Sequence, residues 1–99
     1  MYKHIILWKL KEGLENSEGV KADIKEKLEA LYGVIEGIEF LKVYTNGDET
    51  SSCDIMLDSA FVSREAYLDY KVNPAHVKAA DTFVRPNVET RLCLDFEDR

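Results

Sequence analysis

The sequence predicts an α+β domain whose elements follow the order β-α-β-β-α-β. Four segments rich in β-branched and large apolar residues alternate with two amphipathic segments of helical period. The second and third apolar segments are separated only by a polar stretch that begins with Asn46-Gly47, a strong hairpin signal. The 99 residues contain no internal repeat and no low-complexity tract, so we expect a single domain over residues 1–99.

The first part of the chain supplies a strand and a helix. Residues 3–10 (KHIILWKL) predict a strand whose alternation places His4, Ile6 and Trp8 on one face. After a polar connection, Ser17 is suited to cap a helix and Gly33 to end it. Four residues at helical spacing form its apolar stripe: Val20, Ile24, Leu28 and Leu31.

The central part of the chain predicts a hairpin. Residues 38–45 (IEFLKVYT) and 53–61 (CDIMLDSAF) are the two strands, and the polar loop of residues 46–52 joins them. In the first of these strands, Leu41 and Val43 fall on the face opposite to Phe40 and Tyr44.

The last part of the chain predicts a helix that is broken in two, followed by a strand. Ser63 can cap the first piece, which has Ala66, Tyr67 and Tyr70 on its inner face. Proline disfavours helical geometry in the residue before it but suits the start of a helix, so Asn73-Pro74 ends one piece and begins the next. The second piece has the apolar stripe Val77, Ala80, Phe83 and Val84 and is expected to end at Arg85-Pro86, before a strand at residues 88–96.

This order of elements is that of a ferredoxin-like fold, a four-stranded antiparallel sheet with helices on one face. The other face would be largely apolar, and a face of that size is rarely left in water. We therefore expect a homodimer formed through the sheet face. The residues assigned to that face are Ile5, Leu7, Leu41, Val43, Met56 and either Leu92 or Leu94.

Composition excludes several classes of partner. A net charge of −6 and a pI near 4.9 disfavour nucleic acid and anionic membranes. No apolar run is long enough for a membrane span or a signal peptide, so we expect a cytoplasmic protein. Cys53 and Cys93 are expected to be buried, reduced thiols. Without close His or Cys pairs or a Gly-rich phosphate loop, no metal and no cofactor are expected.

His4 and His76 are the only histidines, and each allows two interpretations. His4 either lies in the core with its ring nitrogens satisfied or lines a pocket. His76 stands near a helix start, where the dipole disfavours the imidazolium, so it is either a general base near pH 7 or a capping or surface histidine. Tyr67 and Tyr70 at helical spacing are usually core residues. However, the bend at Asn73-Pro74 can bring Tyr70 and His76 to one opening, where a phenol and an imidazole could polarise a carbonyl.

Three stretches resemble the stress-responsive dimeric α+β barrel (Dabb) family: KHIILWKLK at 3–11, YKVNPAHVKAAD at 70–81 and DF at 95–96. The resemblance implies a dimeric α+β barrel with the helices outside. The family includes bacterial proteins of unknown role, plant stress proteins and, more distantly similar to this chain, the cyclase that forms olivetolic acid. The cyclase's catalytic pair corresponds to His76 and Tyr70, and its first-strand histidine to His4. A third-strand histidine of the cyclase is replaced here by Ile55.

Two functions follow. The first is a Dabb-type homodimer that binds a small, mostly apolar ligand or has a stress-related role, with ligand contacts from His4, Trp8, Tyr67 and Phe83. The alternative is a cyclase- or lyase-type enzyme in which His76 is the general base, while Tyr70 and His4 orient a carbonyl substrate. Heme handling, known in other dimeric α+β barrels, has no distinctive ligand motif in this sequence.

Overall fold

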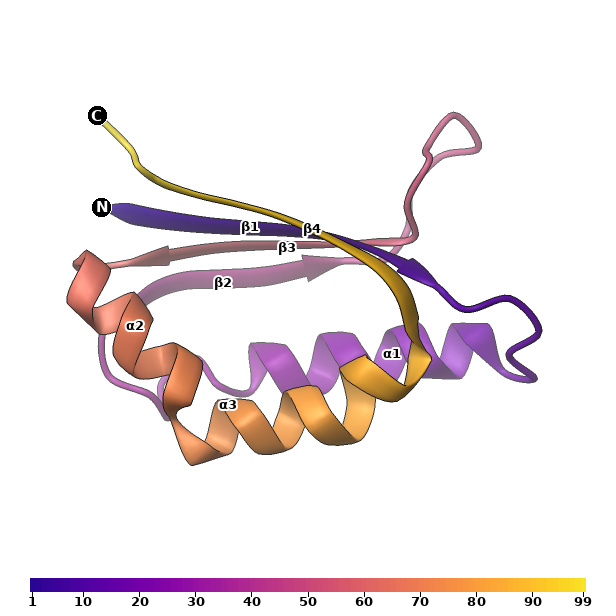
Figure 1. Ribbon diagram of the computed structural model, residues 1–99, viewed down its shortest axis with the longest axis horizontal. Helices are drawn as coiled ribbons and strands as arrows, with labels where there is room; N and C mark the ends of the chain where they lie inside the picture. The colour runs from indigo at the N-terminus through magenta and orange to yellow at the C-terminus, as the bar shows by residue number, and fades with distance from the viewer.

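The computed structural model describes all of residues 1–99 as two layers, a four-stranded sheet and a set of helices beneath it (Figure 1). The strands are β1 (Tyr2–Leu10), β2 (Ile38–Tyr44), β3 (Ile55–Phe61) and β4 (Val88–Glu97). The helices are α1 (Ser17–Glu29), α2 (Arg64–Val72) and α3 (Pro74–Ala79), the last followed by a π turn at Ala80–Val84 and a 3-10 turn at Arg85–Asn87. The predicted order and the ferredoxin-like class are confirmed.

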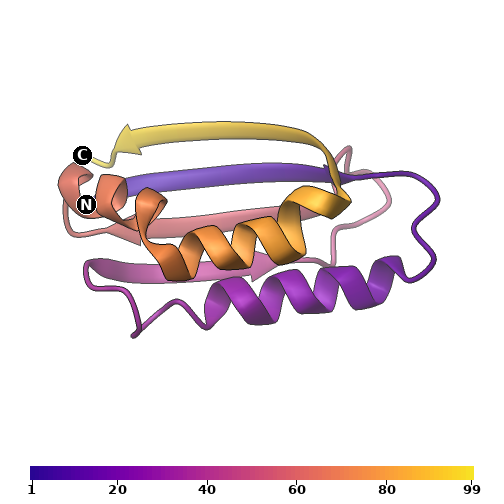
Figure 2. The same cartoon turned by 60° about the horizontal axis from the view of Figure 1, so that its bottom comes forward.

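The sheet has the strand order β2-β3-β1-β4, and every neighbouring pair is antiparallel. β1 is therefore central, as Figure 2 shows, with β3 on one side and β4 on the other. The register sets His4 opposite Ser59 of β3 and opposite Asp95 of β4. Antiparallel partners share a face of the sheet, so this register brings the two ends of the chain together at His4.

The core lies between the sheet and the helices. His4, Ile6 and Trp8 are buried on this inner face of β1, as their alternation predicts. From the helical layer, α1 contributes Ile24 and Leu28, which are likewise buried. The rest of the cluster consists of Leu10, Leu31, Ile35, Leu41, Val43, Ile55, Leu57, Phe61, Tyr67, Tyr70, Ala79 and Val84.

The face assignment of β2 is wrong in the sequence analysis. Leu41 and Val43 were expected on the open sheet face, but both are buried beneath the helices. Phe40 and Tyr44 take their place on the open face, where they are exposed. Both faces of β2 carry apolar residues, so alternation alone could not decide which of them turns inward.

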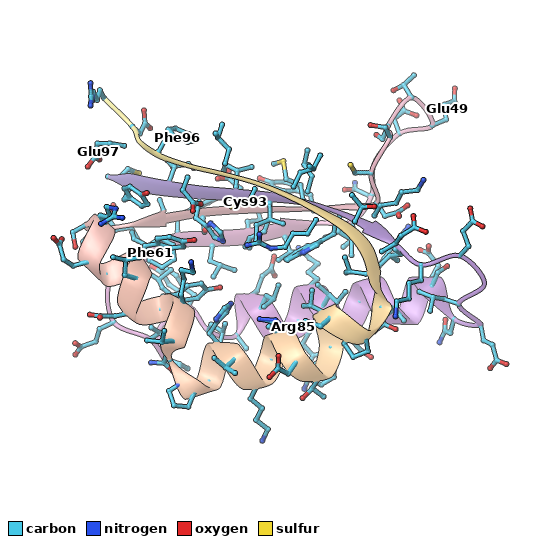
Figure 3. All side chains as sticks on the ribbon, in the orientation of Figure 1. Glu49, Phe61, Arg85, Cys93, Phe96 and Glu97 are labelled. Atoms are coloured by element: carbon cyan, nitrogen blue, oxygen red, sulfur yellow. The ribbon has the colours of Figure 1, made fainter.

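The open face of the sheet is apolar in other strands too. On β4, Leu92 is 58% exposed, Leu94 64% and Phe96 37%. Leu94 lies opposite Ile5 and Leu92 opposite Leu7, so the apolar side chains form a continuous surface across the sheet. Figure 3 shows Phe96 on this side of the sheet and Phe61 on the side that faces the helices.

Three helix boundaries differ from the expectations. Asn16, rather than Ser17, caps α1, because its side chain accepts a hydrogen bond from the Gly19 backbone N–H at 3.0 Å. α1 ends at Glu29, so Gly33, with a φ of +85°, lies in the turn after the helix and does not cap it. The last helical segment does not stop at Arg85-Pro86, since Pro86 sits near the start of a 3-10 turn, where no N–H is required.

The cysteines also differ from the expectation of two buried strand residues. β3 begins at Ile55, so Cys53 lies in the loop before it and is half-buried. Cys93 is exposed, because β4 is an edge strand that the helices leave largely uncovered (Figure 2). None of the helices is long and apolar enough to cross a membrane.

Candidate functional site

A cavity of about 500 Å³ lies between the inner face of the sheet and the helical layer. Five of the six residues proposed from the sequence line this cavity: His4, Trp8, Tyr67, Tyr70 and His76. Phe83 does not line it. Its ring is half-buried, and the Lys27 ammonium lies 5.5 Å from the ring centroid. The other lining residues are Ile6, Leu28, Leu57, Lys71, Ala80, Val84, Arg85, Val88, Glu89 and Arg91.

The bend between α2 and α3 brings Tyr70 and His76 together. Asn73 has φ −63° and ψ 130°, the extended geometry that the following proline favours. Its side chain accepts a hydrogen bond from the Ala75 backbone N–H at 2.9 Å and so caps α3. The rings of Tyr70 and His76 consequently lie in contact in a tilted arrangement, with centroids 4.2 Å apart and planes 36° from parallel.

The Tyr70 hydroxyl is buried and has no hydrogen-bond partner. The residue is only 1% exposed, and its ring packs against Phe61 with centroids 4.9 Å apart. Burial raises the pKa of the Tyr70 phenol well above its ordinary value of 10.0, so it is a neutral donor at neutral pH. Buried hydroxyls almost always find a partner, so the unpartnered Tyr70 hydroxyl is an exception in this structure.

His76 is oriented by the backbone. Its Nδ1 lies 3.1 Å from the Lys71 carbonyl oxygen, which can only accept, so Nδ1 carries the proton and Nε2 is left with a lone pair. Burial lowers the pKa of His76 below its ordinary value of 6.5, and the positive charges of Arg85 and Arg91 lower it further. The hydrogen bond to Lys71 opposes this effect without reversing it. His76 is therefore a neutral base at neutral pH.

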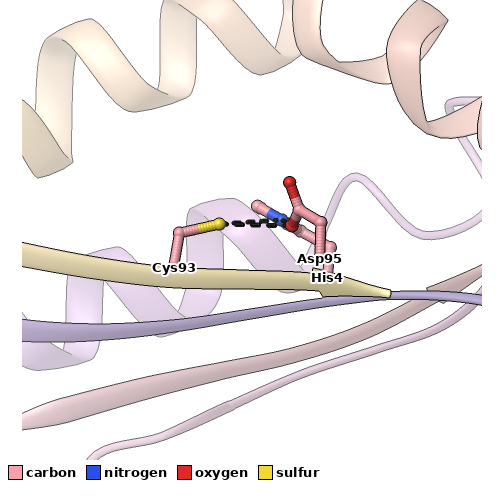
Figure 4. Close-up of side chains that lie close together, drawn as sticks. All are labelled: His4, Cys93 and Asp95. Carbon is pink, nitrogen blue, oxygen red and sulfur yellow. Dashed lines mark hydrogen bonds and ion pairs between the residues drawn. The ribbon is translucent and has the colours of Figure 1, made fainter. Parts of the chain in front are cut away.

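His4 belongs to a hydrogen-bonded network with Asp95 and Tyr67. Its Nδ1 contacts one carboxylate oxygen of Asp95 (Figure 4). The Tyr67 hydroxyl donates to the other carboxylate oxygen at 2.9 Å. Burial lowers the pKa of His4, although Asp95 opposes the shift. Partial burial alone would raise the pKa of Asp95, but the hydrogen bonds from His4, Cys93 and Tyr67 hold it below its ordinary value. The network is thus a carboxylate hydrogen-bonded to a neutral imidazole and to the Tyr67 phenol.

Cys93 completes this cluster. Its thiol donates to Asp95 at 3.2 Å and lies 3.6 Å from the Nδ1 of His4. Burial raises the pKa of this thiol, and so does its hydrogen bond to Asp95. His4, Cys93 and Asp95 each offer a possible metal-ligand atom within 4.8 Å of the others, a grouping that spacing along the sequence did not reveal.

Asp95 is the site residue that sequence reasoning missed. It lies 91 positions from His4 in the chain, and neither residue lies in a local motif with the other. The signal that could have found it is strand register, because β1 and β4 were both predicted and Asp95 pairs directly with His4. The cations Lys71, Arg85 and Arg91 were missed for the same reason, since they come from three different elements.

Comparison with known proteins agrees with this architecture. The family described as the stress responsive A/B barrel domain (Dabb) matches residues 2–98. The chain belongs to this family. The resemblance seen in the sequence is thereby confirmed over nearly the whole chain. No match to the chain is found among curated protein sequences.

Several solved structures are similar to this chain over nearly its whole length. A dimeric ferredoxin-like protein of unknown function from Bacteroides fragilis is 31% identical, with a TM-score of 0.90 over 98% of this chain and 95% of that one. A Dabb family protein from Mesorhizobium loti is 21% identical, with a TM-score of 0.75 over 99% and 96%. The hydroxynitrile lyase from Passiflora edulis is 20% identical, with a TM-score of 0.72 over 96% and 90%, and shares the fold.

Proposed function

We propose that this Dabb protein binds a small, mostly apolar carbonyl compound in the cavity and moves a proton on it. Tyr70 is the hydrogen-bond donor to the carbonyl oxygen, and His76 is the base. His4 is a second polar contact that orients the ligand. The proposal joins the two functions considered from the sequence, because binding an apolar carbonyl compound is the first step of the enzymatic one.

The dimensions and lining of the cavity support a small organic ligand. A volume of about 500 Å³ falls within the range of small-molecule sites, roughly 300–1,000 Å³. Ile6, Trp8, Leu28 and Leu57 contribute apolar surface to the lining, and Tyr70 and the two histidines contribute polar groups. A mostly apolar lining with a few polar groups suits a molecule with an apolar body and a polar group.

The unpartnered Tyr70 hydroxyl is the observation that carries the proposal. Leaving a buried hydroxyl without a partner costs roughly 1–3 kcal/mol of folding stability. A carbonyl oxygen at this position would accept the hydrogen bond and recover that free energy on binding. The hydrogen bond strengthens as negative charge develops on the oxygen, so it favours the transition state over the ground state.

The proton transfer follows from the geometry of His76. Its free Nε2 would take a proton from the carbon next to the carbonyl, and the electron pair would move to the oxygen held by Tyr70. The resulting enolate can bond to an electrophilic carbon, as in a cyclisation, or the reverse sequence can cleave a bond, as in a lyase. The Lys71 carbonyl continues to accept from Nδ1 and stabilises the imidazolium.

The test uses a neutral probe, 4-phenyl-2-butanone. We expect it to raise the melting temperature of the wild type, and its α-protons to exchange with deuterium in D₂O faster with protein than without, as followed by NMR. Tyr70→Phe should weaken both binding and exchange, whereas His76→Gln should retain binding and lose exchange. If the probe binds but its α-protons do not exchange faster with the protein, the protein binds the carbonyl compound and the proposed proton transfer is wrong. Absence of binding would overturn the proposal as a whole.

We also propose that the homodimer forms through the open sheet face. Several structural neighbours, among them the Bacteroides fragilis protein, are described as dimeric. The exposed apolar side chains of this face, including Leu92, Leu94 and Phe96, supply the surface that a second copy would bury. Packing two such faces together leaves the cavity of each subunit on the outer, helical side.

A further inference from the structure

The cavity lining of this acidic protein carries more basic than acidic side chains. The chain as a whole has a net charge of −6. The residues that line the cavity, however, include three cations, Lys71, Arg85 and Arg91, and one carboxylate, Glu89. A local excess of positive charge against the sign of the whole molecule is not expected from composition. It indicates an anionic group on the ligand.

The three cations line the cavity together with both histidines. Lys71 lies in the last turn of α2, Arg85 begins the 3-10 turn, and Arg91 lies on β4, opposite Trp8. The charge of Arg91 is felt by both imidazoles, and it lowers the pKa of each. Arg91 therefore lies within electrostatic reach of both sides of the site.

Two of these cations, Lys71 and Arg91, are not engaged in an ion pair, although Arg91 interacts with the Cys93 thiol. The Nε of Arg85 donates to Asp81 at 2.9 Å, so Arg85 is already paired. Arg91 forms no ion pair, although Glu89 is only two residues away on the same strand. Lys71 forms none either, and its ammonium lies 5.7 Å from the centroid of the Tyr67 ring. Both are exposed and border the cavity, so they stand at its mouth.

We infer that the ligand of this site is an apolar acid whose carboxylate is bound at the cavity mouth by Arg91 and Lys71. The inference rests on the proposed function and narrows its substrate class to carbonyl compounds that also carry a carboxylate. The guanidinium of Arg91 presents two parallel donors that match the two oxygens of a carboxylate, and Lys71 adds a point charge. The apolar body then lies against Trp8 and Ile6, and the carbonyl lies at Tyr70.

The experiment compares 4-oxo-4-phenylbutanoate with its amide, which has the same shape without the charge. We expect the acid to bind the wild-type protein about tenfold more tightly than the amide at low salt, by calorimetry. Added NaCl should reduce that preference, because the two cations are exposed. Arg91→Gln and Lys71→Gln should each weaken binding of the acid more than binding of the amide, and so remove part of the preference. Arg64→Gln is the matched control, since Arg64 is exposed on α2 and does not line the cavity.

The outcomes separate this inference from the proposed function. If the acid and the amide bind equally well while 4-phenyl-2-butanone still binds, the inferred recognition of a carboxylate is wrong, and the proposed carbonyl site is unaffected. An equal loss of preference in Arg64→Gln would also overturn it, because the effect would then come from net charge alone. If 3-phenylpropyl phosphate binds more tightly than the acid, the inference of a carboxylate is wrong and the anionic group of the ligand is a phosphate. If none of the probes binds, the proposed function fails and this inference fails with it.

Discussion

At the scale of single residues, most of the histidine and tyrosine side chains that line the cavity have a hydrogen-bond partner within the protein, and one of them has none. His76 and His4 each have Nδ1 engaged, by the Lys71 carbonyl and the Asp95 carboxylate respectively. Tyr67 donates to Asp95, whereas Tyr70, one turn further along α2, donates to nothing. The same residue type at helical spacing thus occupies one satisfied and one unsatisfied position, and this difference provides a matched pair of variants.

Tyr70→Phe is expected to stabilise the ligand-free protein. The substitution removes a buried hydroxyl that has no partner, so the free energy of unfolding should rise by about 1 kcal/mol. Tyr67→Phe removes a hydroxyl that is bonded to Asp95 and should lower the free energy of unfolding by about 1 kcal/mol. Urea denaturation of both variants measures these changes. Equal destabilisation by the two would contradict the view that the Tyr70 hydroxyl is reserved for a ligand.

At the scale of elements, the break between α2 and α3 determines the geometry of the site. A continuous helix would carry His76 away from Tyr70, because six residues span more than one and a half turns of an α-helix. The extended backbone of Asn73 and the proline after it change the direction of the chain between the two helices. The His76 ring therefore packs on the Tyr70 ring. The cap made by Asn73 fixes the start of α3 and thereby the direction of His76.

Asn73→Ala is expected to affect both stability and ligand binding. Loss of the side-chain cap should lower the free energy of unfolding by about 1 kcal/mol. Because His76 lies in the first turn of α3, binding of 4-phenyl-2-butanone should weaken as well. Asn16→Ala, which removes the equivalent cap of α1 far from the cavity lining, should cost similar stability and leave binding unchanged. Chemical denaturation and thermal shift measure the two effects, and parallel behaviour of both variants would argue against a role for the bend in binding.

At the scale of the whole molecule, the two faces of the sheet differ in what covers them. The inner face and the helices enclose the cavity, and the open face carries apolar side chains in all four strands, among them Leu7, Phe40, Met56 and Leu94. Because the cavity lies within one subunit and the proposed interface lies on the opposite side, assembly and ligand binding can be disturbed separately.

Leu94→Lys is expected to convert the homodimer into a monomer. It places a charge on a side chain that is 64% exposed in the single chain and that lies on the open face of the edge strand β4, opposite Ile5. Val34→Lys is the control, because Val34 is 68% exposed but lies in the connection between α1 and β2. Size-exclusion chromatography with light scattering measures the mass of each. A dimer that survives Leu94→Lys would place the interface elsewhere.

The sequence by itself determined the class and order of the elements, the break at Asn73-Pro74 and five of the residues that line the cavity. These features depend on local periodicity and on proline and capping chemistry, which act over a few neighbouring residues. The bend in particular could be predicted because Pro74 restricts the residue before it whatever the rest of the chain does.

Only the tertiary structure decided which face of β2 turns inward, and it alone brought Asp95 to His4 and Arg91 to the cavity. Leu41 and Phe40 are both apolar, so the pattern of β2 does not distinguish its faces until the helices cover one of them. Asp95 and Arg91 reach the site through the register of β4 against β1, a pairing between distant segments. Contacts of that kind depend on the packing of the whole sheet, and no local sequence pattern specifies them.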